Sequence, residues 1–202
     1  MPFERELILG GQRSGKSRRA EMIAVGWLAA DPAHDAVLIA TGQPHDAEMR
    51  ERIARHQADR AVRVPGLRTV EEPRALPATV AALSAPGTLV VVDCLTLWLT
   101  NLTMPLQGEP ADAGGAAASL VAALRDARGP VVLVGNEIGL GVIPMGREVR
   151  AFVDALGQLN QAVATACDRV TLMAAGLPLT TKLPSPGSRR TRATAVLRRP
   201  VP

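Results

Sequence analysis

The sequence predicts an α/β fold, a mainly parallel β-sheet with helices on both of its faces. Two observations indicate this class. Short runs of Val, Leu and Ile alternate along the chain with helix-length stretches, and such alternation is typical of parallel sheets. The apolar runs also lack interleaved polar residues, which indicates strands that are buried on both faces.

The predicted strands and helices follow one another in a regular order. Five apolar runs are predicted strands, at residues 7–9, 37–41, 89–93, 131–135 and 170–173. Five stretches with apolar residues three and four positions apart are predicted helices, at residues 17–30, 46–58, 73–84, 111–127 and 147–166. The last helix has the clearest pattern, and Asp46 has the side chain of an N-cap for the second. The Gly- and Pro-rich residues 105–115 are a predicted surface loop.

Composition narrows the class of protein further. The chain has 202 residues, of which 47% are hydrophobic, enough for one domain with a sizeable core. No apolar run reaches the roughly 20 residues of a membrane span, and the N-terminus lacks the pattern of a signal peptide. Cys94 and Cys167 form no CxxC pair, indicate neither a disulfide framework nor a zinc site, and are expected to be buried thiols. We therefore expect a cytoplasmic protein.

The positive charge is concentrated at the C-terminus. Five of the 23 basic residues lie in 184–202, a stretch without acidic residues, so that 18 basic and 19 acidic residues remain in 1–183. We predict a folded domain over 1–183 and a disordered, Arg- and Pro-rich tail over 184–202. The nearly neutral body gives no reason to expect nucleic-acid binding. The tail fits either an inert extension or an arm that binds anions or RNA.

A glycine-rich motif follows the first predicted strand. Residues 10–17 match the phosphate-binding pattern GxxxxGK[ST], and a predicted helix begins directly afterwards. Glycines let backbone N–H groups surround phosphate oxygens, and the helix N-terminus adds a partial positive charge. Lys16 is expected to neutralise the β- and γ-phosphates and Ser17 to bind Mg²⁺; an ordinary glycine turn before a helix is the alternative. The predicted nucleotide-binding residues of this loop are Gly10, Gly11, Gln12, Arg13, Ser14, Gly15, Lys16 and Ser17.

Two further residues each fit both a chemical and a structural role. Asp93 ends a predicted strand, at the edge where ligands bind in open α/β sheets. It therefore fits either a partner of Mg²⁺ or the N-cap of a following helix. His56 lies on the same face of its predicted helix as Met49 and Ile53. Its imidazole is either a packed or interface residue, or a nucleophile that attacks phosphorus to form a phosphoramidate.

Motifs from about residue 6 to residue 183 resemble those of the bifunctional adenosylcobinamide kinase/adenosylcobinamide-phosphate guanylyltransferases of cobalamin biosynthesis. The phosphate loop is shared with other P-loop proteins. The helix that carries His56 and the Asn-Glu-x-Gly-x-Gly-x-x-Pro stretch at 136–144 are more specific to this family. The matching pieces are residues 10–17, 39–41, 46, 48–49, 52–53, 56, 68–71, 93–96, 101, 136–144, 159–161 and 168.

The resemblance implies two reactions on a single P-loop NTPase domain. Adenosylcobinamide is phosphorylated on the hydroxyl of its aminopropanol arm by ATP or GTP, and GMP is then transferred from GTP to that phosphate through a covalent GMP–histidine at His56. Lys16 is the second catalytic residue, and Ser17 and Asp93 hold Mg²⁺, partly through water. The nucleotide contacts that the resemblance adds are Ile39, Ala40, Thr41, Gln57, Ala58, Asp59, Arg60, Glu71 and Asp93.

The resemblance also implies partners, and it leaves some roles open. We expect no tightly bound organic cofactor and no nucleic-acid partner, and the family suggests a homotrimer with the corrinoid site between chains. Gln57 stands where the family often has Lys, so that charge assistance to the guanylyl phosphates falls to Arg60 or Arg55. Residues 136–144 form either a tight turn near the substrate or a plain loop, in which Glu137 is a candidate general base. The competing functions are a small-molecule kinase without guanylyl transfer and a nucleotide-dependent binding protein.

Overall fold

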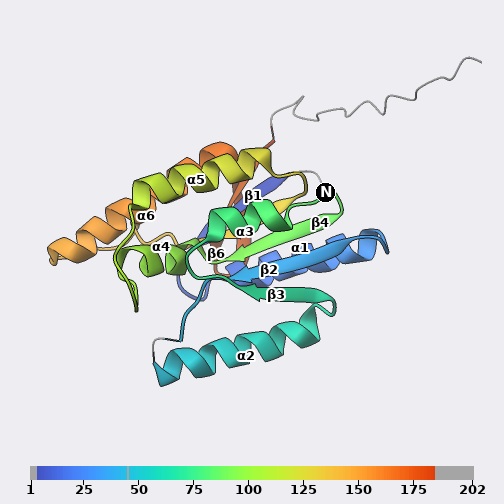
Figure 1. Cartoon of the computed structure of the whole chain (residues 1–202), viewed down its shortest axis with the longest axis horizontal. Coiled ribbons are helices and arrows are strands. Elements are labelled where there is room, and N and C mark those ends of the chain that lie inside the picture. The colour runs from blue at the N-terminus through green and yellow to red at the C-terminus, as the bar shows by residue number, and fades with distance from the viewer. Residues whose placement is uncertain (1–3, 45, 185–202) are drawn as a thin grey trace, which may run out of the picture.

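A seven-stranded sheet forms the centre of the computed structural model, which describes residues 4–44 and 46–184. The strand order is β3-β2-β4-β5-β1-β6-β7 (Figure 1), and all neighbours are parallel except β7, which runs antiparallel to β6 at one edge. The strands are β1 (Arg5–Gly10), β2 (Asp35–Ala40), β3 (Leu67–Glu71), β4 (Thr88–Asp93), β5 (Val131–Val134), β6 (Arg169–Ala174) and β7 (Leu177–Lys182).

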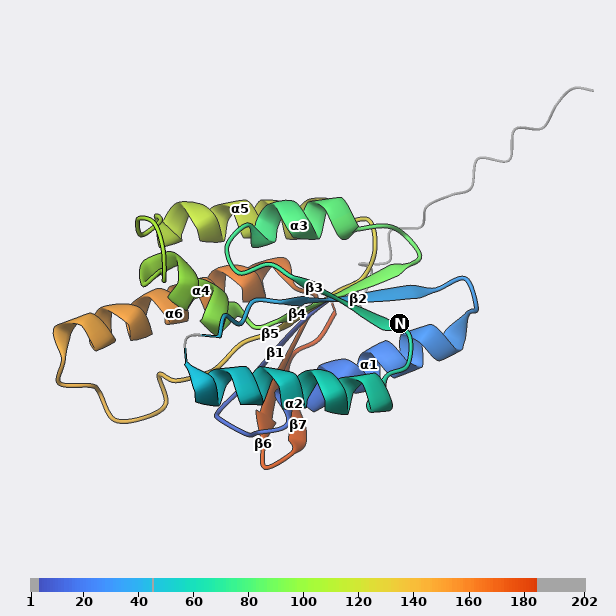
Figure 2. The same ribbon diagram turned by 60° about the horizontal axis from the view of Figure 1, so that its bottom comes forward.

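Helices cover both faces of the sheet. In the described part of the chain they are α1 (Lys16–Ala30), α2 (Ala47–Arg63), α3 (Leu76–Leu83), α4 (Leu95–Thr103), α5 (Ala113–Asp126) and α6 (Arg147–Ala166). Figure 2 shows α3 to α6 on one face of the sheet and α1 and α2 on the other. Because the strands β1 to β6 run parallel, their carboxyl ends lie at one edge of the sheet, and the loops that follow them gather there.

The strands separate two hydrophobic cores. Val90 and Val92 of β4 point into the core beneath α3 to α6, whereas Leu89 and Val91 point into the core beneath α1. All four side chains are fully buried, which explains why these apolar runs contain no interleaved polar residues. Burying each such side chain stabilises the fold by about 1.5–3 kcal/mol.

Helix α2 is attached to the body differently from the other helices. Of its residues whose burial is described, only Arg60 is buried, and Figure 1 shows the helix standing apart from the sheet, beside β3. Asp46 is its N-cap, as predicted, and accepts a hydrogen bond from the Met49 N–H at 2.7 Å. Val64, directly after its last residue, packs into the core beneath α1. Polar contacts and the C-terminal end therefore hold this helix, because it has no wide apolar face.

The structure confirms the predicted fold class and contains all five predicted strands and all five predicted helices, with ends shifted by up to five residues. Three elements were missed. Strands β3 and β7 lie at the two edges of the sheet, and their sequences LRTVE and LPLTTK remain largely exposed, so they lack the buried apolar run that marks the others. The third is α4, whose N-cap is Cys94; Asp93 therefore does not cap this helix. The tail predicted over 184–202 lies outside the described residues, apart from Pro184.

Candidate active site

The phosphate loop connects β1 to α1 at the carboxyl edge of the sheet. Gly10 has a φ of +153°, and a Cβ atom there would lie 2.5 Å from the carbonyl oxygen of Met173, so the close approach requires glycine. Gly15, with a φ of +96°, is the N-cap of α1. The ammonium of Lys16 is almost buried and donates a hydrogen bond to the Gly11 carbonyl oxygen at 2.6 Å. Lys16 thus lies against its own loop, where this motif binds phosphate.

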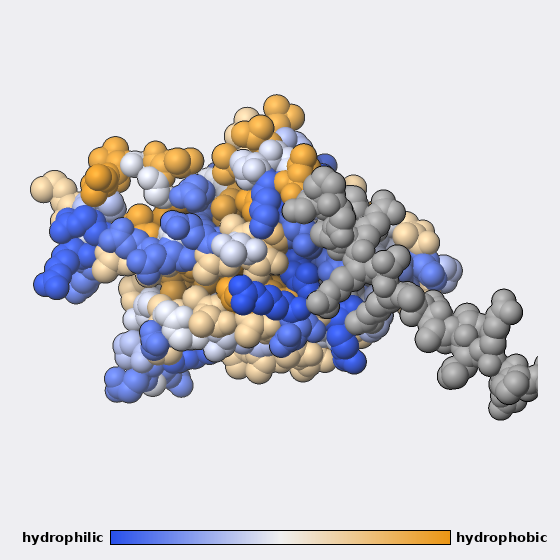
Figure 3. Space-filling view, turned by 90° about the horizontal axis from the view of Figure 1, so that it is seen from above, coloured by the Kyte–Doolittle hydropathy of each residue, from blue (hydrophilic) through white to orange (hydrophobic). Residues whose placement is uncertain are grey.

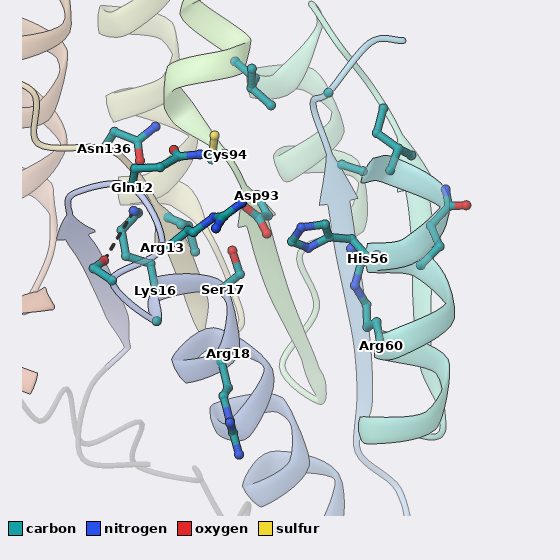
Figure 4. A pocket seen from close by; sticks show the side chains of 18 of the residues that line it. Gln12, Arg13, Lys16, Ser17, Arg18, His56, Arg60, Asp93, Cys94 and Asn136 are labelled. Carbon is teal, nitrogen blue, oxygen red and sulfur yellow. Dashed lines mark hydrogen bonds between the residues drawn. The ribbon is translucent and has the colours of Figure 1, made fainter. Parts of the chain in front are cut away.

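Asp93 faces the phosphate loop from the end of β4. The hydroxyl of Ser17 faces its carboxylate (Figure 4), so that the two predicted Mg²⁺-binding residues lie side by side. Burial raises the pKa of the Asp93 carboxyl, and the nearby charge of Glu21 raises it further. Ser17, Arg60 and His56 act in the opposite direction and lower the pKa of Asp93. A hydroxyl and a carboxylate are oxygen ligands of the kind that Mg²⁺ prefers.

Helix α2 supplies the wall opposite the phosphate loop. The His56 side chain projects from α2 toward Asp93 and Ser17 (Figure 4). Ile53, one turn before it, and Met49, two turns before it, line the same pocket. His56 is exposed and is therefore not packed in the core. The interpretation of this histidine as a packed residue is excluded for this chain, and its ring is open to a ligand in the pocket.

Polar contacts hold α2 against the body. Gln57 donates a hydrogen bond from Nε2 to Oε1 of Glu71 on β3 at 3.2 Å, and Arg60 donates one from Nη1 to the Thr69 hydroxyl at 3.1 Å. Arg60 lies only at an electrostatic distance from Glu21 of α1, with 3.7 Å between Nε and Oε1. These contacts cluster in the C-terminal half of the helix and leave its N-terminal half to border the pocket.

A pocket of about 420 Å³ lies between the phosphate loop and α2. Cys94, Leu97, Val134 and Asn136 form its remaining wall. The backbone of Asn136 is fixed from two sides, because its N–H donates to the Thr96 hydroxyl at 2.9 Å and its carbonyl accepts from Asn160 at 3.1 Å. The pocket therefore combines a phosphate loop and an imidazole with carboxylate, amide and guanidinium groups.

Most of the predicted site residues border this pocket. They are Gln12, Arg13, Ser14, Gly15, Lys16, Ser17, Ala40, His56, Gln57, Arg60, Glu71 and Asp93. The pocket lining does not include Gly10, Gly11, Ile39, Thr41, Ala58 or Asp59. Ile39 lies in the hydrophobic core, and Ala58 and Asp59 are exposed on α2. Roles of these residues in nucleotide binding stay predictions.

Thr41 is fully buried and has structural partners. Its hydroxyl donates to the Cys94 carbonyl oxygen at 2.7 Å and accepts from the Cys94 N–H at 2.8 Å. Asn101 of α4 donates to the Thr41 carbonyl oxygen at 2.7 Å. In this structure the Thr41 side chain thus positions the backbone beside Asp93 and does not reach into the pocket.

Sequence reasoning assigned no site role to several lining residues, among them Arg63 and Leu97, and reached Asn136 only as part of a motif. The signal for Asn136 was its position directly after a buried strand. Glu137, the candidate general base, is not among the lining residues, and its Oε1 accepts a hydrogen bond from the Gly139 N–H at 2.9 Å.

Both cysteines are buried thiols, as predicted. Burial is the main cause that raises the pKa of Cys94 to about 11 and that of Cys167 to about 12. Both side chains are therefore protonated at neutral pH, and Cys94 borders the pocket as a thiol. Within residues 4–44 and 46–184, no helix is long and apolar enough to cross a membrane.

A strand, a glycine loop ending in Lys-Ser and a helix, with a carboxylate from a second parallel strand touching the loop, define a P-loop nucleotide-binding protein. The fold is similar to that of the flagellar accessory protein FlaH from Methanocaldococcus jannaschii, with a TM-score of 0.51 and 10% sequence identity over 91% of this chain and 80% of that one. The family model described as cobinamide kinase / cobinamide phosphate guanyltransferase matches residues 6–181. The chain therefore belongs to this family, as its motifs predicted.

Full-length relatives agree with this assignment. The chain is 47% identical over 178 residues to the bifunctional adenosylcobalamin biosynthesis protein CobP of Pseudomonas aeruginosa. This alignment covers 88% of this chain and 97% of that protein. It is 37% identical over 182 residues to the bifunctional adenosylcobalamin biosynthesis protein CobU of Salmonella typhimurium, with 85% and 96% covered. The alignments thus span nearly the whole of both relatives.

Proposed function

We propose that this protein carries out both reactions of its family on the pocket described above: phosphorylation of adenosylcobinamide by ATP or GTP, and transfer of GMP from GTP to the resulting phosphate through His56. One observation carries the proposal. The exposed imidazole of His56 faces the phosphate loop across the pocket, next to Asp93 and Ser17. A P-loop kinase that only transfers a γ-phosphoryl group needs no nucleophilic side chain on that wall.

Phosphoryl transfer requires positioning and charge neutralisation. Lys16, now bonded to the Gly11 carbonyl oxygen, would exchange this partner for phosphate oxygens, and the backbone N–H groups of the loop would surround the rest. Ser17 and Asp93 would hold Mg²⁺, which neutralises phosphate charge when bound. Their placement side by side supports this assignment, because it brings two oxygen ligands together.

Guanylyl transfer would use His56 as a nucleophile. A deprotonated ring nitrogen attacks the α-phosphorus of GTP, a P–N bond forms, and the bond to the bridging oxygen of the β-phosphate breaks to release pyrophosphate. A phosphate oxygen of adenosylcobinamide phosphate then attacks the same phosphorus, and the P–N bond breaks to return neutral imidazole.

Two charged or polar groups beside His56 suit the nucleotide. Arg60, one helical turn further along α2, lies close enough to lower the pKa of Asp93. It would neutralise the guanylyl phosphate in place of the lysine that the family often has at position 57. Glu71 borders the pocket and is held by Gln57. Its carboxylate would accept hydrogen bonds from the N–H edge of guanine, which adenine lacks in that arrangement.

We also propose that the chain assembles into a homo-oligomer, a trimer by the family resemblance. An apolar segment supports this: Leu140, Val142, Ile143 and Met145 are each at least 78% exposed. Figure 3 shows hydrophobic side chains at the end of the molecule where α6 begins. Monomers rarely expose so many neighbouring apolar side chains.

Labelling with α-labelled GTP tests the function. We expect covalent label on the wild-type protein and none on His56→Ala, with the acid-labile and base-stable behaviour of a phosphoramidate. His34→Ala is the matched control, since His34 stacks on Trp27 and lies outside the pocket lining, and it should be labelled like wild type. A wild-type protein that takes up no label but still phosphorylates adenosylcobinamide would be a kinase without guanylyl transfer. Label retained by His56→Ala would remove His56 from the mechanism.

A further inference from the structure

We infer that Glu21 of α1 is a positioning residue for guanylyl transfer: its carboxylate fixes the C-terminal end of α2 and thereby sets where His56 lies relative to the phosphate loop. The inference rests on the proposed role of His56. Glu21 carries no part of the phosphate-binding motif, and it is only 3% exposed. A buried carboxylate needs partners, and its partners here come from α2.

One carboxylate faces two arginines of the histidine-bearing helix. Arg63 donates from Nε to Glu21 Oε2 at 2.8 Å and from Nη2 to Oε1 at 3.3 Å, a two-bond arrangement that fixes direction as well as distance. The Nε atom of Arg60 lies 3.7 Å from Glu21 Oε1. The Arg60 side chain is itself buried, so water screens this charge less than it screens a surface pair.

We call the contacts of Glu21 with Arg60 and Arg63 the clamp. The spacing of these residues couples the clamp to the reacting groups. Ser17 and Glu21 lie four positions apart on α1, and His56 and Arg60 lie four positions apart on α2, so each pair shares one helix face. Because Glu21 pairs with Arg60, the same two faces place Ser17 and His56 on either side of the pocket. Figure 4 shows His56 and Arg60 beside each other on α2, with Ser17 across from them.

The other contacts of α2 are few, so the clamp contributes a large share of what holds this helix in position. The Gln57–Glu71 bond joins two exposed side chains. The Arg60–Thr69 bond and the packing of Val64 also hold the C-terminal end of α2, but among the described residues only Glu21 contacts both Arg60 and Arg63. A misplacement of about 1 Å is enough to slow a positioned reaction by about 100-fold. Loss of the Glu21 charge is therefore expected to slow attack by His56. Phosphoryl transfer depends on the phosphate loop and Ser17, whereas the hydrogen bonds and ion pairs of Glu21 within the described part of the chain go to Arg60 and Arg63 of α2. It should therefore change much less.

The test compares the two reactions in Glu21→Gln. We expect the single-turnover rate of covalent labelling by α-labelled GTP to fall by about tenfold or more, while ATP-dependent phosphorylation of adenosylcobinamide changes by less than about threefold. Glu21→Asp, which keeps the charge, should recover part of the labelling rate. Glu6→Gln is the matched control: it removes a buried carboxylate that pairs with Arg19 of α1 at 3.2 Å, away from α2, and should leave the ratio of the two rates unchanged.

Three results would overturn the inference. They are a labelling rate in Glu21→Gln equal to wild type, an equal fall in both reactions, or the same change of ratio in Glu6→Gln. Should Glu21→Gln not fold by circular dichroism, Arg63→Gln decides, because Arg63 is partly exposed and its loss should lower the labelling rate selectively; an unchanged ratio there also overturns the inference. A wild-type protein that takes up no label would instead reject the proposed role of His56.

Discussion

The hydroxyl of Thr41 and the backbone of Cys94 exchange two hydrogen bonds, which join the carboxyl ends of β2 and β4. The distances are 2.7 Å to the Cys94 carbonyl oxygen and 2.8 Å from its N–H, and all of these atoms are buried. Cys94 follows Asp93 directly in the chain. The contact therefore fixes the backbone that presents the Asp93 carboxylate to Ser17.

Thr41→Val should destabilise the fold, because it keeps the shape of the side chain and leaves the buried Cys94 N–H without this partner, while the Cys94 carbonyl oxygen still accepts the Trp98 N–H. We expect the free energy of unfolding to fall by about 2 kcal/mol, since each unpaired buried group costs about 1–3 kcal/mol. Urea denaturation measures it. Thr103→Val is the control, because the Thr103 hydroxyl bonds only within its own helix, to the Leu99 carbonyl oxygen. An equal loss in both variants would show that the position of Thr41 is not special.

The raised pKa of Asp93 predicts a pH-dependent effect on stability. Burial raises the pKa of this carboxyl above its ordinary value of 3.8, so that between the two values the folded protein binds more protons than the unfolded chain. Stability contributed by this group therefore falls as the pH rises through that window. Asp93→Asn should be more stable than wild type at pH 7, and the difference should shrink toward pH 4. Chemical denaturation across this range measures the effect.

Asp35 provides a control of opposite sign. A hydrogen bond from Arg68 lowers the pKa of the Asp35 carboxyl, so its stabilising contribution is present above the ordinary pKa and is lost as the pH falls below it. Asp35→Asn should therefore be no more stable than wild type at pH 7. The same stabilisation in both variants would trace the Asp93 effect to overall charge and not to burial.

The sequence predicted those parts of the molecule in which burial or motif spacing leaves a mark. The four apolar residues before Asp93 marked β4, and the glycines of residues 10–17 marked the phosphate loop, because both depend on local residue types. The edge strands β3 and β7 were missed, since exposed strands carry no continuous apolar run. The partners of Glu21 were also out of reach, because Arg63 lies 42 positions away in the chain and only the tertiary fold brings the two together.

Glu71→Gln should weaken the preference for guanine. A carboxylate at the pocket accepts hydrogen bonds from guanine N–H groups, and an amide would present a donor to one of them, so we expect the KM for GTP to rise by about tenfold or more. The KM for ATP in the kinase reaction should change little. Steady-state kinetics with both nucleotides measures the difference, with Glu48→Gln, an exposed residue in the first turn of α2, as the control. Parallel changes in the two KM values would contradict a base-reading role.

Ile143→Asp should disrupt assembly of the protein if the exposed apolar segment lies between copies. Ile143 is 78% exposed and Val142 beside it 95%, and a buried, unpaired carboxylate in an interface costs several kcal/mol, enough to dissociate a moderate complex. Sedimentation velocity should then show the wild-type oligomer replaced by monomer. Val62→Asp is the matched control, because Val62 is a comparably exposed (81%) apolar residue on α2. Oligomers of unchanged size in Ile143→Asp would place the interface elsewhere on the surface, and a wild-type monomer would reject the assembly itself.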